Sequence, residues 1–420
     1  MILYRTSLYN DYTTGNISLQ GESNKYSILI LTSVLSLSII KVFYFDIILH
    51  SGGIMITIQD TIQLPDTYPL ERLGNPKDIL FFDIETTGFS GDTSQLYLIG
   101  CTYYTSTGWQ LIQWFADTKD SELQLLHAFF DLLSHFSTVV HFNGDGFDIP
   151  YLLKRCAHYH LDYTFSKVKS IDIYKKFRPY KKLLGLSSLK QKSIEQFLGV
   201  QRKDTYSGGE LILVYHDYLH SKDPMLYHML LLHNTDDLKG MPSILPALYY
   251  PDFLESSFTC FSQYIETLSS APTLMLQAQS QFAIPVPFSA VSSIGSIQVE
   301  QNIVTLQIPL YQGTLKYFYP NYKEYYYLPA EDRAIHKSVG EFVEKSARKK
   351  ATAQTCYMKQ SGLFLPQLTP LFEPILRQNP KDTLCFSQYK ETLFSDPSKC
   401  TSFIHQIFAC AESSYCKADA

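Results

Sequence analysis

A short apolar strand that ends in two acids limits most strongly what this chain can fold into. The stretch DILFFDIETTGFSGD runs from Asp78 to Asp92 and places Asp83 and Glu85 among hydrophobic neighbours. Residues i and i+2 of a β-strand point to the same face, so both carboxylates would share one side of a sheet. Burying an unpaired carboxylate is costly. Either these acids are solvated at a strand end, or the fold uses both of them in a site.

Two later segments carry acids that a fold could bring to the same place. In HFNGDGFDIPYLL an expected strand ends at Asn143, and Asp148 follows at the start of an expected helix, where the helix dipole alone would also favour an acid. In LLLHNTDDLKGM, His233 and Asp237 are four residues apart and therefore lie on one helix face. The plain alternative is a surface aspartate beside a packed histidine. Asp236 competes with Asp237 for the role of the functional acid.

Together these segments supply a set of carboxylates that would repel one another unless something neutralised them. The set is Asp83, Glu85, Asp148 and Asp237. Oxygen ligands of this kind suit Mg²⁺ or Mn²⁺. Two such ions about 4 Å apart can clamp a phosphodiester, one activating water and the other stabilising the leaving oxygen. The sequence therefore predicts a site for two Mg²⁺ or Mn²⁺ ions and no small-molecule cofactor.

The three motifs resemble those of a known superfamily. FDIETTG, NGDGFDIPYL and HNTDDL are similar to the exonuclease motifs of the DnaQ-like, DEDD-type 3′–5′ exonucleases, which have an RNase H-like fold. Within that superfamily the chain most resembles the YprB-type ribonuclease H-like domain, through LGLSSLKQKSIEQFLGVQRKD and YSGGELI. The resemblance covers about residues 76–250 of the 420.

The resemblance implies roles for the motif residues. Asp83 and Glu85 would bind both metal ions, and Asp148 would bind the second ion directly or through water. Asp237 would hold the ion on the side of the nucleophile. His233 would be the base that orients the attacking water. It stands four residues before Asp237, where the family usually has tyrosine, whereas a family histidine usually stands five residues before the last aspartate.

Substrate contacts are expected from two further stretches. The resemblance implies that the first motif meets the terminal nucleotide through Thr86, Thr87 and Gly88 and that Asn143 supports the second motif. Residues 167–192 carry nine Lys and Arg against the single acid Asp172, which we interpret as structural. This excess predicts phosphate contacts, which we assign to Lys175, Lys176 and Arg178. Aromatic residues lie between them and could stack on bases, namely Tyr174, Phe177 and Tyr180.

The alternative for this basic stretch is a solvated lysine-rich loop. The run KSARKK, Lys345 to Lys350, could extend it. The formal net charge of −5 excludes a generally basic nucleic-acid coat but not a local patch. Eight cysteines without a CxxC pair indicate reduced thiols and a cytoplasmic protein.

The pattern of expected elements predicts an α/β fold, with an RNase H-like mixed β-sheet flanked by helices and a smaller C-terminal α+β domain. We expect a lead-in at 55–75, an exonuclease domain at 76–250 and a linker at 251–270. Residues 271–420 would form the C-terminal domain, for which no motif indicates a role. Within it, residues 331–350 predict one amphipathic helix.

Residues 1–54 differ in composition from the rest. Their apolar run YSILILTSVLSLSII has 15 residues, fewer than the roughly 20 of a spanning helix. Lys41 and Asp46 would lie inside any longer span. We interpret the segment as a start-site error with Met55 as the true start. A membrane anchor at 27–49 and a disordered or packed extension are the alternatives.

The sequence therefore predicts a metal-dependent 3′–5′ exonuclease that acts on single-stranded DNA or RNA ends by a two-metal mechanism. A rival interpretation is a nucleic-acid-binding module that keeps the RNase H-like fold without cutting. A third is a membrane-tethered protein whose nuclease fold is an interaction platform, and it requires residues 1–54 to be translated.

Overall fold

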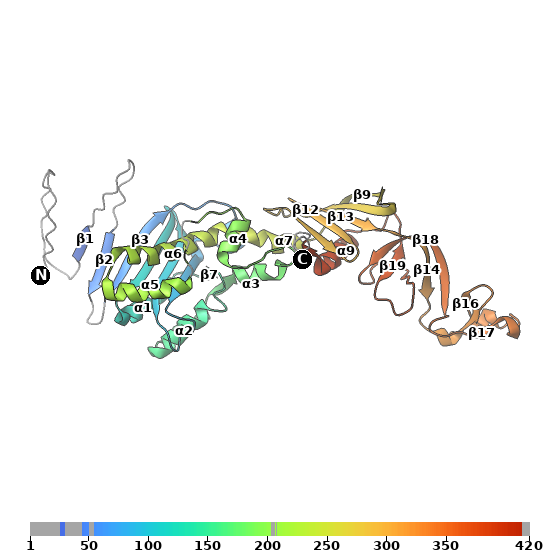
Figure 1. Cartoon of the computed structure of the whole chain (residues 1–420), viewed down its shortest axis with the longest axis horizontal. Coiled ribbons are helices and arrows are strands. Elements are labelled where there is room, and N and C mark those ends of the chain that lie inside the picture. Colours follow the sequence, from blue (N-terminus) through green and yellow to red (C-terminus); the bar gives the residue numbers. More distant parts are fainter. Residues whose placement is uncertain (1–25, 30–43, 50–53, 203–205, 207, 414–420) are drawn as a thin grey trace.

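The computed structural model of the protein describes residues 26–29, 44–49, 54–202, 206 and 208–413. Figure 1 shows an elongated molecule, with a helix-covered sheet towards the N-terminus and a β-rich region towards the C-terminus. Most of the segment 1–54 lies outside the described residues, so its origin stays a prediction. Its described parts, β1 (Tyr26–Leu29) and β2 (Tyr44–Leu49), are antiparallel strands. Among the described residues, no helix has the length and apolarity needed to cross a membrane.

In the described part of the chain, the main sheet has the strand order β1-β2-β3-β6-β5-β4-β7-β8. Its other strands are β3 (Ile54–Ile62), β4 (Ile79–Thr86), β5 (Leu96–Thr105), β6 (Gly108–Ala116), β7 (Thr138–His141) and β8 (Lys169–Asp172). The order is antiparallel from β3 to β4 and parallel from β4 to β8. The predicted mixed sheet is therefore confirmed. Residues expected as a lead-in supply β3, which pairs with β6.

Helices flank this sheet as the sequence predicted. The predicted ones are α1 (Glu122–Leu133), α2 (Asp148–His158), α4 (Gln191–Phe197), α5 (Gly208–Ser221) and α6 (Pro224–Ser243). The short helices α3 (Ile173–Phe177) and α7 (Tyr249–Leu254) were not predicted. The central strand β4 is apolar on both faces, as a strand covered on two sides must be. Phe82 contacts Phe129 of α1, with ring centroids 5.3 Å apart. Phe81 lies in the same hydrophobic cluster as Leu238 and Met241 of α6.

The C-terminal region is built mainly of antiparallel strands. The largest of its sheets has the order β20-β11-β12-β13-β10-β9 in the described part of the chain. These strands are β9 (Thr259–Leu268), β10 (Ala271–Gln279), β11 (Phe288–Ser292), β12 (Gly295–Glu300), β13 (Ile303–Pro309) and β20 (Glu412–Ser413). The helix α9 (Pro397–Cys410) contributes Phe403 and Ile407 to the core beneath them. Two smaller sheets follow further from the main sheet (Figure 1).

The smaller sheets correct one prediction. Their strands are β14 (Tyr311–Phe318), β15 (Tyr325–Leu328), β16 (Arg333–His336), β17 (Lys349–Lys350), β18 (Tyr357–Gln367) and β19 (Cys385–Gln388). The predicted amphipathic helix at 331–350 is wrong, because β16 and β17 pair with the two edges of β15. The short helix α8 (Lys337–Gly340) and a 3-10 turn at Lys345–Ala347 form there instead. The pairing of these strands with β15 decides the structure of this segment, and a helical spacing of apolar residues does not reveal such pairing.

The expected linker at 251–270 is also folded. It supplies the end of α7 and the whole of β9. Phe253 and Phe258 are fully buried, and they belong to a hydrophobic cluster that continues from β4 into the C-terminal sheet. Tyr250 donates a hydrogen bond to the backbone oxygen of Val286 at 2.7 Å. The two regions are therefore joined by shared core rather than by a free connection.

Candidate metal centre

The strand β4 presents Asp83 and Glu85 to the face that α6 covers. Gly100 of β5 is in register with Asp83, and a Cβ at this position would collide with Asn234 of α6. This close approach lets Asn234 donate a hydrogen bond to Asp83 Oδ2 at 2.8 Å. Gln113 of β6 in turn donates to Asn234 Oδ1 at 2.8 Å. Asp83 is thus held in one orientation by a partner that sequence reasoning missed, although Asn234 directly follows His233 in the third motif.

The carboxyls of all three motifs meet at this end of the sheet. Burial raises the pKa of Asp83 well above its usual range, and neighbouring carboxyls add to the shift, in decreasing order Asp237, Glu85 and Asp148. Burial also raises the pKa of Asp148 to about 7, and Asp172 and Asp237 contribute. Carboxyls influence one another in this way only at short range. The other three predicted acids therefore lie within electrostatic range of Asp83, and on α6 it is Asp237, rather than Asp236, that raises the pKa of Asp83.

His233 lies inside this group. Its Nε2 is 3.7 Å from Oε1 of Glu85 and 3.4 Å from Oδ2 of Asp237. One ligand atom from each of these three residues lies within 4.8 Å of the other two. The donor set at the site is therefore mainly oxygen with one imidazole nitrogen, a combination that suits a divalent first-row ion. Sequence reasoning predicted the oxygen ligands but placed His233 only as a base.

The turn that leads into α2 is fixed by Asp172 at the end of β8. Its carboxylate accepts hydrogen bonds from the backbone N–H groups of Asn143, Asp145 and Lys175 at 3.0, 3.2 and 3.1 Å. Asn143 adopts a positive φ of 64° in this turn. Asp172 thereby fixes the turn after which α2 begins at Asp148. This agrees with the interpretation of Asp172 as structural and gives the physical reason for it.

A second group of potential ligands lies beneath the same turn, formed by His141, Asp145 and Asp172. His141 Nδ1 accepts the backbone N–H of Gly144 at 3.0 Å, and its Nε2 lies 2.7 Å from the hydroxyl of Ser170. Ser170 donates to Asp145 at 2.6 Å. These atoms are engaged in holding the turn, so the group is part of the scaffold of the candidate site.

The loop after β4 presents an exposed aromatic side chain next to the start of α2. Thr86 donates to the backbone oxygen of Gly88 at 2.8 Å, and the hydroxyl of Thr87 accepts a backbone N–H from across the loop at 2.9 Å. Phe89 follows and is 91% exposed. Its ring lies edge-on to the ring of Phe147, with the two centroids 6.5 Å apart. Sequence reasoning missed Phe89. The available signal was a large apolar residue directly after the TTG turn of the first motif.

The cations of the basic stretch are exposed to solvent, but not all of its aromatic residues are. Lys175, Lys176 and Arg178 are exposed, and Lys175 Nζ lies 3.3 Å from Oδ2 of Asp145. Phe177 is fully buried in the core, so the interpretation of this residue as a base-stacking platform is wrong. Tyr180 donates its hydroxyl to Glu255 at 2.6 Å. Burial of Phe177 holds the short helix α3 against the core of the protein.

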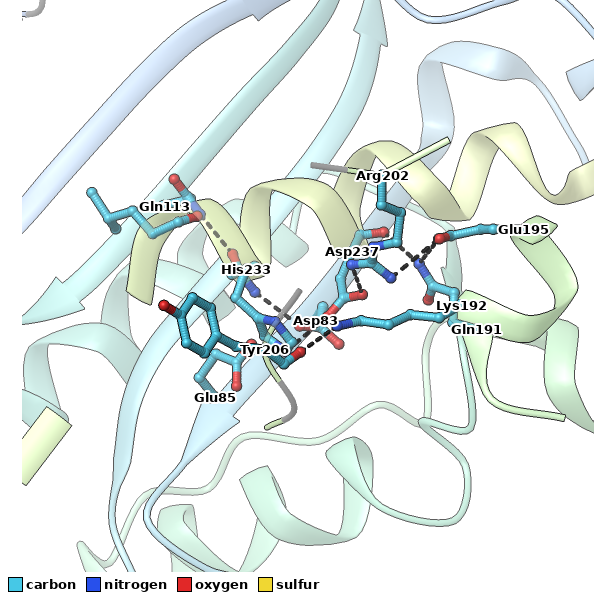
Figure 2. A network of polar contacts seen from close by, with 12 residues as sticks. Asp83, Glu85, Gln113, Gln191, Lys192, Glu195, Arg202, Tyr206, His233 and Asp237 are labelled. Atoms are coloured by element: carbon cyan, nitrogen blue, oxygen red, sulfur yellow. Dashed lines mark hydrogen bonds and ion pairs between the residues drawn. The ribbon is translucent and has the colours of Figure 1, made fainter. Parts of the chain in front are cut away.

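A polar network surrounds Asp237 on the side of α4 (Figure 2). Arg202 Nη2 lies 2.5 Å from Oδ1 of Asp237, and Nη1 lies 3.2 Å from Oε2 of Glu195. Gln191 donates to the backbone oxygen of Asp237 and to Glu195 Oε1, both at 2.9 Å. A Cβ at Gly240 would collide with Glu195, so glycine is what allows α4 and α6 to approach so closely. Sequence reasoning missed Arg202 as a site residue.

Comparisons with known proteins support an RNase H-like fold for part of the chain. Residues 80–249 match a family model described as the RNase H superfamily. This region contains the four acids and His233. The match and the mixed sheet define an RNase H-like fold for the N-terminal half of the molecule. No curated protein matches the chain.

Several solved structures are similar to the chain at low sequence identity. The family B DNA polymerase of the hyperthermophilic archaeon Pyrobaculum calidifontis is 13% identical, with a TM-score of 0.34, over 58% of this chain and 34% of that one. A product-bound exonuclease I is 10% identical, with a TM-score of 0.29, over 47% and 58%. A zinc-bound E. coli ExoI–ssDNA complex is 12% identical, with a TM-score of 0.25, over 49% and 55%. The chain thus spans less than two thirds of each.

Proposed function

We propose that this protein is a metal-dependent 3′–5′ exonuclease of the YprB-type, DnaQ-like kind. The observation that carries the proposal is the gathering of three carboxyls, those of Glu85, Asp148 and Asp237, around the buried Asp83, whose pKa is raised first by burial and then by these three. Buried acids that repel one another cost stability. A site for divalent cations explains why the fold brings them together.

Four carboxyls fit such ions. Asp83, Glu85, Asp148 and Asp237 would hold two Mg²⁺ or Mn²⁺ ions. When bound, the ions would supply Lewis-acid activation of water and charge stabilisation at the leaving oxygen.

The remaining chemistry belongs to the chain's own groups. Asn234 keeps Asp83 oriented by its hydrogen bond to Oδ2. His233 would accept a proton of the attacking water at Nε2, since this atom already lies beside Glu85 and Asp237. Asp172 keeps Asp148 at the site by fixing the preceding turn.

Substrate binding would combine stacking with phosphate contacts. Phe89 is exposed in the loop that follows Asp83 and Glu85, and an exposed aromatic ring suits the face of a terminal base. Its loop is shaped by Thr86, Thr87 and Gly88, which would lie along the terminal nucleotide. The exposed cations of the basic stretch would then bind phosphates further along a single strand.

The assay that tests the proposal uses single-stranded DNA and RNA, each labelled at the 3′ or the 5′ end, with Mg²⁺ or Mn²⁺. We expect shortening from the 3′ end by the wild type and loss of activity in Asp83→Asn and Asp237→Asn. Asp131→Asn, an exposed acid on α1, is the matched control and should keep activity. A wild-type protein that shortens none of these substrates would overturn the nuclease proposal.

A non-catalytic nucleic-acid-binding module is the second candidate. The ion pair between Arg202 and Asp237 favours it, because it occupies an acid that a cutting enzyme would use for metal. Retained strand binding without cleavage in either metal would support this candidate.

Phe89 offers a separate test of strand binding. Phe89→Ala should weaken the affinity for a labelled single strand by about 1–3 kcal/mol, the usual contribution of one stacked base. Phe342→Ala is the matched control, since Phe342 is 92% exposed and lies in the C-terminal region. Equal loss of affinity in both variants, measured by fluorescence anisotropy, would contradict a specific role for Phe89.

A further inference from the structure

The ion pair at Asp237 has an unusual feature in its cation. Arg202 follows α4 and is only 9% exposed in its side chain. It bridges two acids, Asp237 on α6 and Glu195 on α4 (Figure 2). Its Nε is buried with no hydrogen-bond partner among the described residues. A guanidinium has five N–H donors, so Arg202 has donors that its two acid partners do not use.

A second buried arginine shows what a structural role looks like in the same domain. Arg155 places Nε and Nη2 on the two oxygens of Glu122, each at 2.6 Å. Its Nη1 donates to the backbone oxygen of Gly91 at 2.9 Å. The fork of Arg155 is matched to one carboxylate, whereas the fork of Arg202 is divided between two and leaves Nε unused.

We propose that Arg202 is an internal counter-ion of Asp237 that a divalent cation displaces, and that the released guanidinium then binds a phosphate of the nucleic-acid strand. This inference rests on the proposed function, because it takes Asp237 as a metal ligand. It adds a substrate-binding residue to the site and a reason why the acid cluster is tolerated before metal binds.

The surroundings of Arg202 favour an exchange of partners over a general rearrangement. Gln191 fixes both acids, through the backbone oxygen of Asp237 and through Glu195 Oε1. The close contact of α4 with α6 at Gly240 leaves little room for Glu195 to move. Glu195 can therefore keep Nη1 while Nη2 leaves Asp237. A planar guanidinium that turns in this way presents the paired N–H groups that recognise phosphate.

Competition for Asp237 predicts a change in metal affinity that needs no nucleic acid. Calorimetric titration of MnCl₂ should show that Arg202→Gln binds Mn²⁺ about tenfold or more tightly than the wild type, because one charge-assisted hydrogen bond no longer has to break. Arg72→Gln is the matched control. Arg72 pairs with Asp252 at 2.8 Å, outside the acid cluster, and its loss should leave Mn²⁺ affinity unchanged.

The second half of the proposal predicts the opposite effect on strand binding. With EDTA present, Arg202→Gln and the wild type should bind a labelled single strand equally, because Arg202 is held by Asp237. With Ca²⁺ present, Arg202→Gln should bind the strand about tenfold more weakly, for the loss of one phosphate contact. Equal affinity of the two proteins in Ca²⁺ would overturn the phosphate role.

Arg202→Lys keeps the experiment decisive if Arg202→Gln does not fold, since lysine keeps the charge but not the fork. Its Mn²⁺ affinity should lie between those of the wild type and a protein without the cation. Equal Mn²⁺ affinity in the wild type and in the folded variant would overturn this inference alone. A wild-type protein that binds no Mn²⁺ would overturn the proposed function together with it.

Discussion

The buried acids of the RNase H-like region differ in how their charge is compensated. Glu122 at the start of α1 receives Arg155 on both oxygens, the backbone N–H of Leu96 at 2.8 Å and the hydroxyl of Tyr159 at 2.9 Å. Asp83 on β4 accepts a hydrogen bond from Asn234 and faces three other carboxyls. Glu122 is compensated by protein groups alone. At the candidate site Arg202 offsets the charge of Asp237, whereas three carboxyls raise the pKa of Asp83. The degree to which buried charge is compensated therefore separates scaffold from candidate site.

The largest effect should come from breaking the compensated group. Arg155→Met leaves Glu122 buried without its cation, so we expect the free energy of unfolding to fall by about 3–5 kcal/mol. Urea unfolding followed by circular dichroism measures it. A loss below about 1 kcal/mol would mean that the pair is not a stabilising part of the scaffold.

Asp172 lies near the candidate site, but three backbone N–H groups compensate its charge. It should therefore behave as part of the scaffold, like Glu122. Asp172→Ala removes all three acceptor contacts and should lower the free energy of unfolding by about 2–3 kcal/mol.

Asp172→Asn keeps one acceptor oxygen and should recover part of both stability and nuclease activity. Activity that falls equally in the two variants at unchanged stability would instead place Asp172 in the reaction itself.

Asp83, in the less compensated group, should respond in the opposite direction. Asp83→Asn removes a buried charge that three carboxyls oppose, so the metal-free protein should gain about 0.5–2 kcal/mol of stability while it loses activity. Thermal unfolding in EDTA measures the gain. Asp131→Asn should change neither property, and a destabilised Asp83→Asn would show that the hydrogen bond from Asn234 outweighs the repulsion.

The pH dependence of stability tests the same group of acids. The pKa of Asp148 is raised to about 7 in the folded protein, first by burial, whereas an unfolded aspartate has about 3.9. The folded state therefore holds the proton more tightly, and the contribution of Asp148 to stability is complete below about pH 4 and lost as the pH rises through about 7.

Metal-free wild type should accordingly lose more stability than Asp148→Asn between pH 5 and pH 8. Parallel stability profiles of the two proteins in EDTA would contradict a raised pKa at this position.

Much of the fold followed from local pattern. The apolar run of β4, the helical spacing of α1, α2 and α6, and the mixed sheet were all predicted and are confirmed. The helix expected at 331–350 was wrong because its segments pair with β15, and the expected linker became β9. Pairing with a distant strand leaves no periodic trace in the paired segment itself.

The sequence by itself determined which acids could form a site, because strand alternation and helical spacing fix the face on which a side chain lies. The tertiary structure alone decided their partners. Asn234 reaches Asp83 only because Gly100 admits α6, and Arg202 reaches Asp237 only because Gly240 admits α4. Such contacts depend on the distance between packed elements, and residues far apart in the chain carry no local signal of it.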